Sequence, residues 1–268
     1  MTPKPIGIFD SGVGGLTVAR AIRKALPMAN IWYFGDTEHM PYGEKSPATI
    51  RGYVRTISKY LSQRGAGSIV IACNTASALG YEEAVLACPH LPVINVIDPV
   101  VAYVSQHFAH ADVAVIGTRG TIASGVYPTR LTAAAPGMRV HTLATPILAS
   151  LIEENIAKPE VITGIVSHYL DRPGIRDAKV LILACTHYPL IRQEISRVVG
   201  PDVTIIDPGE WVAESIKSSL GEDAHGRGEM YCEVSDYTDA FADVAKRIFG
   251  ENLQMNEYRL WEMTQTGE

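Results

Sequence analysis

Ser68-Ile-Val-Ile-Ala-Cys73-Asn74-Thr75 is an apolar run that ends in a cysteine and two polar residues, and Val180-Leu-Ile-Leu-Ala-Cys185-Thr186-His187 repeats it at an offset of 112 positions (185 − 73). Val93–Pro99 matches Val203–Pro208 at an offset of 109 (207 − 98), and Ile6–Gly12 more loosely matches Val113–Arg119 at 107 (117 − 10). Similar offsets in one order predict a duplicated βα unit. The alternative is that Val- and Ile-rich strands resemble one another in any α/β protein.

Short β-branched runs alternate with longer helical stretches, which predicts βαβ units with parallel sheets. The runs are Ile6–Phe9, Ile31–Phe34, Ser68–Ala72, Val93–Val96, Val113–Ile116, Val140–Leu143, Val180–Ala184 and Val203–Ile206. They are almost wholly apolar, as expected where helices cover both faces of a sheet. The predicted fold class is α/β, with two pseudo-symmetric lobes, each a mainly parallel sheet covered by helices, and the active site in the cleft between them.

The expected lobes are residues 1–97 plus 208–268, and residues 98–207. After Pro208 the duplication ends, and about sixty residues remain. They include a helical stretch around Ala240–Phe249 and strand-like Glu229–Val234 and Leu253–Leu260. We expect this tail to pack on the first lobe.

Composition and charge exclude several classes of protein. The chain has 268 residues, of which 47% are hydrophobic and 19% charged, and a net charge of -6. This is the composition of a globular protein, and the scattered basic residues argue against a nucleic-acid or membrane surface. The N-terminus carries no apolar stretch of signal-peptide length and no run approaches a membrane span, so we expect a cytoplasmic protein.

The four cysteines, at positions 73, 88, 185 and 232, show neither a C-x-x-C pair nor zinc spacing. No disulfide framework and no metal site is therefore expected. Cys73 and Cys185 stand at strand ends, where α/β sheets present side chains to ligands, and two facing lobes would place both thiols across one cleft. A lone buried cysteine is usually a small core residue, which is our interpretation of Cys88 and Cys232.

The turn Asp10-Ser11-Gly12-Val13-Gly14-Gly15 lies between a strand and the helical Val18–Leu26, a position that suits a phosphate or a carboxylate. It mimics a dinucleotide fingerprint because Asp36 ends the next strand, but Thr17 stands where the third glycine belongs. Asp10 would hinder a nucleotide phosphate. It can accept a substrate ammonium or help to deprotonate a thiol, and it can equally be a turn residue.

Other polar residues follow the predicted strands. Gly35–Ser46 is expected to form a wall of the cleft, with an ordinary surface loop as the alternative. Thr118 and Thr121 can donate to a carboxylate or cap a helix. His187, two residues after Cys185, can hold a proton near that thiol or favour the thiolate. Glu153 and Glu154 would by default be solvated charges at a helix end.

Taken together, four segments closely resemble the glutamate racemase family: Gly7–Gly15, Gly35–Gly43, Ala72–Ser77 and Ala184–Leu190. They also distinguish the chain from the aspartate racemases. The resemblance implies a cofactor-independent racemase that supplies D-glutamate for bacterial peptidoglycan and usually works as a homodimer.

The resemblance also implies roles for residues. Cys73 and Cys185 would be the two acid/base thiols, with Asp10 supporting the first and His187 the second, and Asp36 and Glu153 would be auxiliary acids. The residues implied to line the substrate are Ser11, Pro41, Tyr42, Gly43, Asn74, Thr75, Thr118, Thr121 and Thr186. The chain departs from the family at Ala144-Thr145-Pro146, where the family often has Ala-Cys-Pro.

Inverting an α-carbon requires one group to remove the proton and another to deliver a proton to the opposite face. For L-glutamate the resemblance suggests Cys185 as base and Cys73 as acid, with the roles reversed for D-glutamate. The alternatives are a cysteine hydrolase with Cys73 as nucleophile and His187 as base, and a two-lobed amino-acid binding protein. A nicotinamide enzyme is the weakest alternative.

Overall fold

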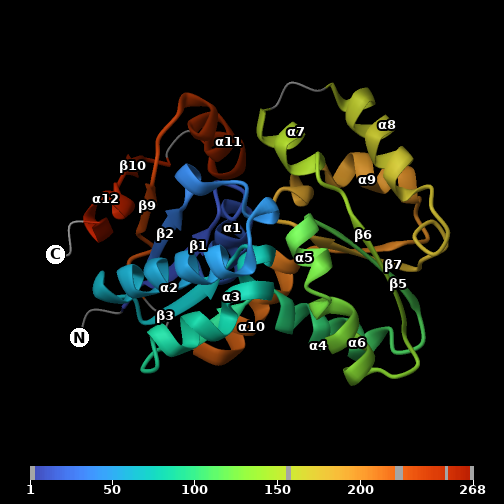
Figure 1. Cartoon of the computed structure of the whole chain (residues 1–268), viewed down its shortest axis with the longest axis horizontal. Coiled ribbons are helices and arrows are strands. Elements are labelled where there is room, and N and C mark those ends of the chain that lie inside the picture. Colours follow the sequence, from blue (N-terminus) through green and yellow to red (C-terminus); the bar gives the residue numbers. More distant parts are fainter. Residues whose placement is uncertain (1–3, 155–157, 221–225, 251–252, 266–268) are drawn as a thin grey trace.

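The computed structural model describes residues 4–154, 158–220, 226–250 and 253–265. It consists of two lobes, each built on a parallel sheet covered by helices (Figure 1). The predicted fold class is confirmed. The helix α12 (Leu260–Gln265), where the described part of the chain ends, lies at the outer side of the first lobe, and the second lobe is formed by the middle of the chain.

The first sheet has the strand order β10-β9-β2-β1-β3-β4. Its strands are β1 (Ile6–Asp10), β2 (Ile31–Gly35), β3 (Ser68–Ile71), β4 (Val93–Asn95), β9 (Met230–Val234) and β10 (Met255–Glu257). The tail packs on the first lobe as expected, because β9 pairs in parallel with β2. One prediction was too long: only 255–257 of the expected strand 253–260 pairs with β9, and a helix begins at Leu260.

The second sheet has the order β6-β5-β7-β8, with β5 (Asp112–Gly117), β6 (Arg139–Ala144), β7 (Val180–Ala184) and β8 (Thr204–Ile206). The order β2-β1-β3-β4 in the first sheet corresponds strand for strand to the order β6-β5-β7-β8 in the second. Because the repeats in the sequence match β1 with β5, β3 with β7 and β4 with β8, the sheet order supports the duplicated unit. The carboxyl ends of β3 and β7, each followed by a cysteine, thus occupy equivalent places in the two lobes.

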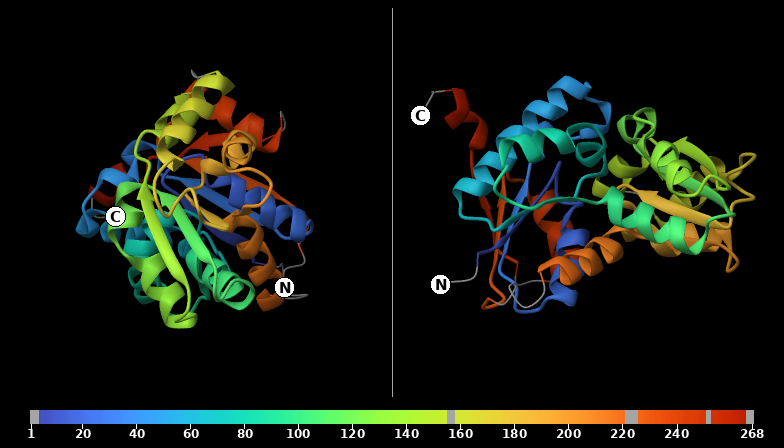
Figure 2. Two further views of the ribbon diagram at one scale, coloured as in Figure 1. Left: turned by 90° about the vertical axis from the view of Figure 1, so that its right-hand side faces the viewer. Right: turned by 90° about the horizontal axis from the view of Figure 1, so that it is seen from below.

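Helices cover both faces of each sheet (Figure 2). Their bounds are α1 Leu16–Ala25, α2 Pro47–Gln63, α3 Asn74–Ala87, α4 Ile97–His107, α5 Arg119–Ala123, α6 Val126–Ala134, α7 Leu148–Glu154, α8 Pro159–Leu170, α9 Arg192–Val199, α10 Pro208–Leu220, α11 Asp239–Phe249 and α12 Leu260–Gln265, with 3-10 turns η1 Thr37–His39, η2 Tyr42–Glu44 and η3 Tyr188–Ile191.

One buried cluster runs through both lobes, where α1, α10 and α11 cover the first sheet and α4 and α6 cover the second. The opposite faces are packed by α2, α3 and α12 in the first lobe and by α7, α8, α9 and η3 in the second. The shared core holds the two sheets together with their carboxyl edges close. The lobe boundaries at residues 98 and 208 stay a prediction.

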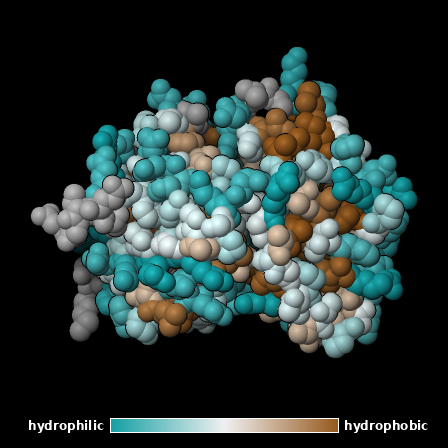
Figure 3. Space-filling model, in the orientation of Figure 1, coloured by the Kyte–Doolittle hydropathy of each residue, from teal (hydrophilic) through white to brown (hydrophobic). Residues whose placement is uncertain are grey.

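The face of the molecule that Figure 3 shows is mostly polar. Apolar side chains gather on it near α7 and the start of α8. Ile147 and Val161, at these places, are about half exposed. Among the helices of the described residues, none is both long and apolar enough to cross a membrane.

Candidate active site

A cavity between the lobes brings together both predicted thiols. Cys73 and Cys185 line it and are nearly enclosed, with 6% and 5% of their surfaces exposed. The other lining residues come from both lobes and are Ser11, Met40, Pro41, Tyr42, Gly43, Asn74, Thr75, Thr118, Ala149, Glu153, Ala184, Thr186 and His187. The two strand-end cysteines of the repeat therefore face a single site.

Cys73 lies just before α3 and caps it. The backbone N–H of Ala76 donates to its Sγ at 3.5 Å, and the thiol donates to Oγ of Ser11 at 3.7 Å. Burial raises the pKa of Cys73 to about 12 and the Asp10 carboxylate adds to this, while the contacts with Ala76 and Ser11 act in the opposite direction. Cys73 is thus a thiol at neutral pH and suited to donate a proton.

Cys185 has a different environment, because its partner is an imidazole. Sγ of Cys185 lies 3.7 Å from Nδ1 of His187, and Nε2 of His187 lies 2.6 Å from Oε1 of Glu153. Burial alone would lower the pKa of His187, but Glu153 and Cys185 outweigh it and hold the pKa well above its usual value. His187 is therefore an imidazolium, and it lies between the Cys185 thiol and the Glu153 carboxylate.

Asp10 ends β1 behind the cavity wall and is fully buried. It accepts hydrogen bonds from the N–H of Gly12 at 3.0 Å and, across the lobes, from the hydroxyl of Thr186 at 3.2 Å. Burial raises its pKa from 3.8 to about 6, against the effects of His187, Gly12 and Thr186. Asp10 thus couples the first glycine turn to the Cys185 segment.

We expect Asp10→Asn to stabilise the fold at pH 7 to 8 by up to about 3 kcal/mol. The folded state binds the Asp10 proton more tightly than the unfolded chain, so the contribution is favourable below about pH 4 and is lost as the pH rises through about 6. Urea unfolding at pH 4 and pH 8 measures this. The exposed Asp202, changed to Asn, is the control. Equal effects of the two substitutions at pH 8 would contradict the prediction.

The glycine turn at Gly12–Gly15 allows the two lobes to pack closely against each other. A Cβ on Gly14 would lie 2.5 Å from Cε1 of His187 and 2.7 Å from Oγ1 of Thr186, and one on Gly15 would lie 2.4 Å from Cβ of Asp10. The space that the sequence assigned to an anion is thus filled, at Gly14, by the Thr186-His187 segment of the second lobe. This packing explains the glycines without a nucleotide.

Hydroxyl groups of both lobes meet at one end of the cavity. Oγ1 of Thr75 lies 2.8 Å from Oγ1 of Thr118 and 3.2 Å from Oγ1 of Thr121. Asn74 accepts a hydrogen bond from the hydroxyl of Tyr127 at 2.8 Å, while its Nδ2 has no partner among the described residues. A pinned amide with unused donors beside several hydroxyls is suited to bind a carboxylate.

Asp36 does not line the cavity. Its carboxylate accepts hydrogen bonds from Tyr42 at 2.5 Å, from Ser235 at 3.0 Å and from Nε1 of Trp261 at 2.8 Å, and lies 3.0 Å from Nδ1 of His39. It ties the Pro41-Tyr42-Gly43 wall to the C-terminal helix α12. The structure therefore places Asp36 where it positions the loop, out of reach of the cavity.

Most of the predicted site residues line the cavity, whereas Asp10, Asp36 and Thr121 lie behind it. Met40 lies in the wall segment that the sequence predicted, whereas sequence reasoning missed Ala149 in the lining and Tyr127 and Tyr188 behind it. Tyr188 directly follows the Cys-Thr-His segment, so its place in the sequence was a usable signal. Tyr127 sits in a helix with no such signal.

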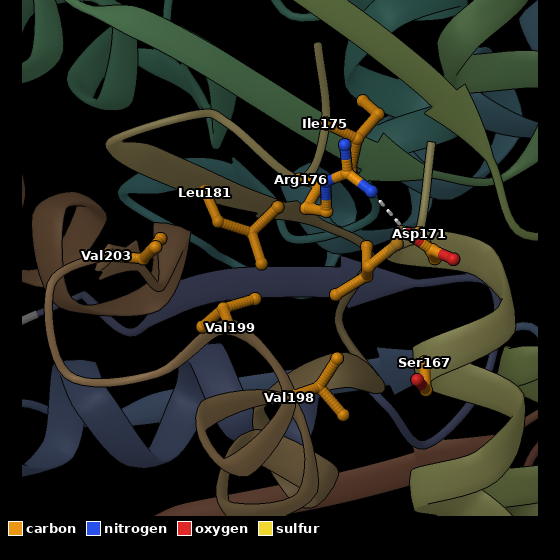
Figure 4. A pocket seen from close by; sticks show the side chains of 9 residues that line it. Ser167, Asp171, Ile175, Arg176, Leu181, Val198, Val199 and Val203 are labelled. Atoms are coloured by element: carbon orange, nitrogen blue, oxygen red, sulfur yellow. Dashed lines mark hydrogen bonds and ion pairs between the residues drawn. The ribbon is translucent and has the colours of Figure 1, made fainter. Parts of the chain in front are cut away.

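A second cavity opens on the far side of the second lobe, between α8, α9 and β7 (Figure 4). Its walls are mainly Leu and Val side chains, with the ion pair of Arg176 and Asp171, 3.0 Å apart, at one side. Neither cysteine of the repeat reaches it. The described residues that line it include no cysteine and no histidine.

Known proteins that are similar to this chain are racemases. A model of the Asp/Glu/Hydantoin racemase family matches residues 16–216. The glutamate racemase of Aquifex aeolicus (strain VF5) is 39% identical over 250 residues, covering 93% of this chain and 95% of that protein. The chain belongs to the glutamate racemase family. It is accordingly an isomerase, as the sequence predicted.

Solved glutamate racemases share the whole fold. The enzyme from Francisella tularensis subsp. tularensis SCHU S4, in complex with D-glutamate, superposes with a TM-score of 0.88 at 31% identity, over 98% of this chain and all of the other (100%). The Thermus thermophilus enzyme, in complex with beta-chloro-D-alanine, gives a TM-score of 0.85 at 34% identity over 98% and 100%. The two-lobed architecture of this racemase is thus that of the family.

Proposed function

We propose that this racemase interconverts L-glutamate and D-glutamate, without a cofactor, through Cys73 and Cys185. The observation that carries the proposal is that both thiols line one enclosed cavity from equivalent strand ends of two opposed lobes. A substrate and a product that are mirror images suit a site with two similar halves. The name of the matched enzymes and the D-glutamate complex of one of them support glutamate as substrate.

In the proposed reaction from L-glutamate, the Cys185 thiolate takes the α-proton and the electron pair remains on the α-carbon, partly shared with the carboxylate. Cys73, a thiol with its pKa raised to about 12, then gives its proton to the opposite face. The product is D-glutamate, with Cys185 protonated and Cys73 ionised. This is the form of the enzyme that begins the reverse reaction.

The α-proton is far less acidic than a thiol, so the site must stabilise the developing charge. The free amide donors of Asn74 and the hydroxyls of Thr75 and Thr118 are the groups we propose to hold the substrate carboxylates. The Pro41–Gly43 wall, anchored through Asp36, would exclude water. Held in this way, the α-carbon lies between the two sulfurs.

A cysteine hydrolase is the alternative to a racemase that one observation in the structure supports. The sequence paired Cys73 with His187, but His187 lies against Cys185, with Glu153 on its other nitrogen. Such a chain of thiol, imidazole and carboxylate is also found in hydrolases. The second thiol in the same cavity has no role in that chemistry, which is why racemisation is favoured.

The test is to incubate the purified protein with L-glutamate in heavy water without added cofactor. We expect optical rotation to fall to zero while deuterium enters the α-position of the product. L-glutamine in a parallel sample tests the hydrolase, which would release ammonia. Loss of rotation without deuterium, or no change with glutamate, would contradict the proposal.

We also propose that the D-glutamate serves peptidoglycan synthesis in the cytoplasm and that the enzyme is a homodimer. The family membership supports these proposals. Light scattering with and without glutamate measures the oligomeric state.

A further inference from the structure

A buried hydrogen bond between the lobes joins Tyr127 to Asn74. Tyr127 lies in α6 of the second lobe, and Asn74 is the first residue of α3 in the first lobe. Both residues are buried, at 1% and 2% exposure. The Tyr127 hydroxyl donates to Oδ1 of Asn74 at 2.8 Å, across 53 positions of the chain. The side chain that follows Cys73 is thus held from the opposite lobe.

The Tyr127 hydroxyl is the donor in this bond. Burial raises the pKa of Tyr127 above its ordinary value, so the hydroxyl keeps its proton. Among the described residues this hydroxyl has no second hydrogen-bond partner. If the Asn74 amide were turned over, Nδ2 would donate to Tyr127 and the phenolic proton would be buried without an acceptor, which is costly. Tyr127 therefore selects one orientation of the amide.

The selected orientation turns the donors of Asn74 toward the cavity. Oδ1 and Nδ2 point away from each other across the planar amide, Oδ1 faces Tyr127, and Asn74 lines the cavity. Nδ2 is buried and has no hydrogen-bond partner in the described part of the chain. Its two N–H groups are therefore free to donate to carboxylate oxygens. In the reverse orientation an amide oxygen would face the substrate carboxylate and repel it.

We propose that Tyr127 is a positioning residue for carboxylate binding, whose hydroxyl fixes the Asn74 amide with both donors toward the substrate. The inference rests on the proposed function. Tyr127 does not line the cavity, so it acts through Asn74. Its ring packs in the core cluster that runs through both lobes, so the orientation of these donors depends on how the lobes pack.

The test is Tyr127→Phe, which removes the hydroxyl and keeps the ring in the core. The donors serve binding and are no longer held, so we expect KM for each enantiomer of glutamate to rise about 10-fold and kcat to change by less than about 3-fold. Calorimetry should show the same loss of affinity. Tyr81→Phe is the matched control, because this hydroxyl of α3 donates to the carbonyl of Val93 at 3.4 Å, away from the cavity lining. We expect its kinetics to be those of the unmodified enzyme.

The decisive measurement is a double-mutant cycle of Tyr127→Phe with Asn74→Ala. Asn74→Ala alone removes hydrogen bonds to a charged group and should weaken glutamate binding by about 10-fold to 100-fold. If Tyr127 acts through the amide, the double variant should bind glutamate within about 2-fold of Asn74→Ala. The cycle is measured on kcat/KM and, by calorimetry, on glutamate affinity, which needs no turnover. Thermal unfolding of each variant reports on folding.

Losses that multiply in the double variant would overturn the inference, because a purely structural effect of Tyr127 does not depend on Asn74. Unchanged glutamate affinity in Tyr127→Phe would overturn it as well. The unmodified enzyme distinguishes this failure from that of the proposed function. If it racemises glutamate while the two losses multiply, only the role of Tyr127 is wrong. If it neither binds nor racemises glutamate, the proposed function is wrong.

Discussion

Replacing either Cys73 or Cys185 by alanine is expected to lower racemisation of glutamate by at least about 10³-fold. Each thiol faces the same cavity, and among the described residues that line it these two are the only cysteines. Loss of one therefore stops proton transfer at one face, and the centre cannot be inverted. Circular dichroism with each enantiomer measures the rate.

Cys88→Ala is the matched control, because it makes the same chemical change at a buried thiol outside the cavity. We expect it to cost stability but to leave kcat near that of the unmodified enzyme. Each single variant should still bind glutamate, which calorimetry can show. Rapid racemisation by Cys73→Ala or Cys185→Ala would refute the two-thiol mechanism.

The second large effect is expected from a residue that carries no chemistry. Gly14→Ala places a methyl group 2.5 Å from Cε1 of His187, well inside normal contact. The Cys185-His187 segment must move by about 1 Å, and a displacement of that size can lower kcat/KM by about 100-fold. Steady-state kinetics with L-glutamate measures the loss.

Gly52→Ala is the control for this prediction. Gly52 lies in the exposed part of α2, where an added Cβ meets nothing within 4 Å. Alanine there should stabilise the helix by roughly 0.5 to 1 kcal/mol and leave the kinetics unchanged. Should Gly14→Ala turn over at the rate of Gly52→Ala, the close approach of the two lobes at Gly14 would have no part in catalysis.

The fold was predictable because short apolar runs in the sequence mark its strands. Runs such as Ile6–Phe9 and Val180–Ala184 are apolar throughout since helices cover both faces of each sheet, and the structure has strands at both places. The expected strand 253–260 failed because an edge strand needs only a few paired residues, and no apolar pattern marks where its pairing with β9 ends.

The sequence by itself determined that Cys73 and Cys185 stand at equivalent places, because strand-end position and internal repetition are properties of short segments. Only the tertiary structure decided which groups surround them. Glu153 meets His187, Asp10 reaches Thr186 across 176 positions, and Asp36 turns away from the cavity to Trp261, 225 positions later. Such pairings depend on how two separately formed sheets pack against each other, and hydrogen bonds over those sequence distances leave no local pattern to read.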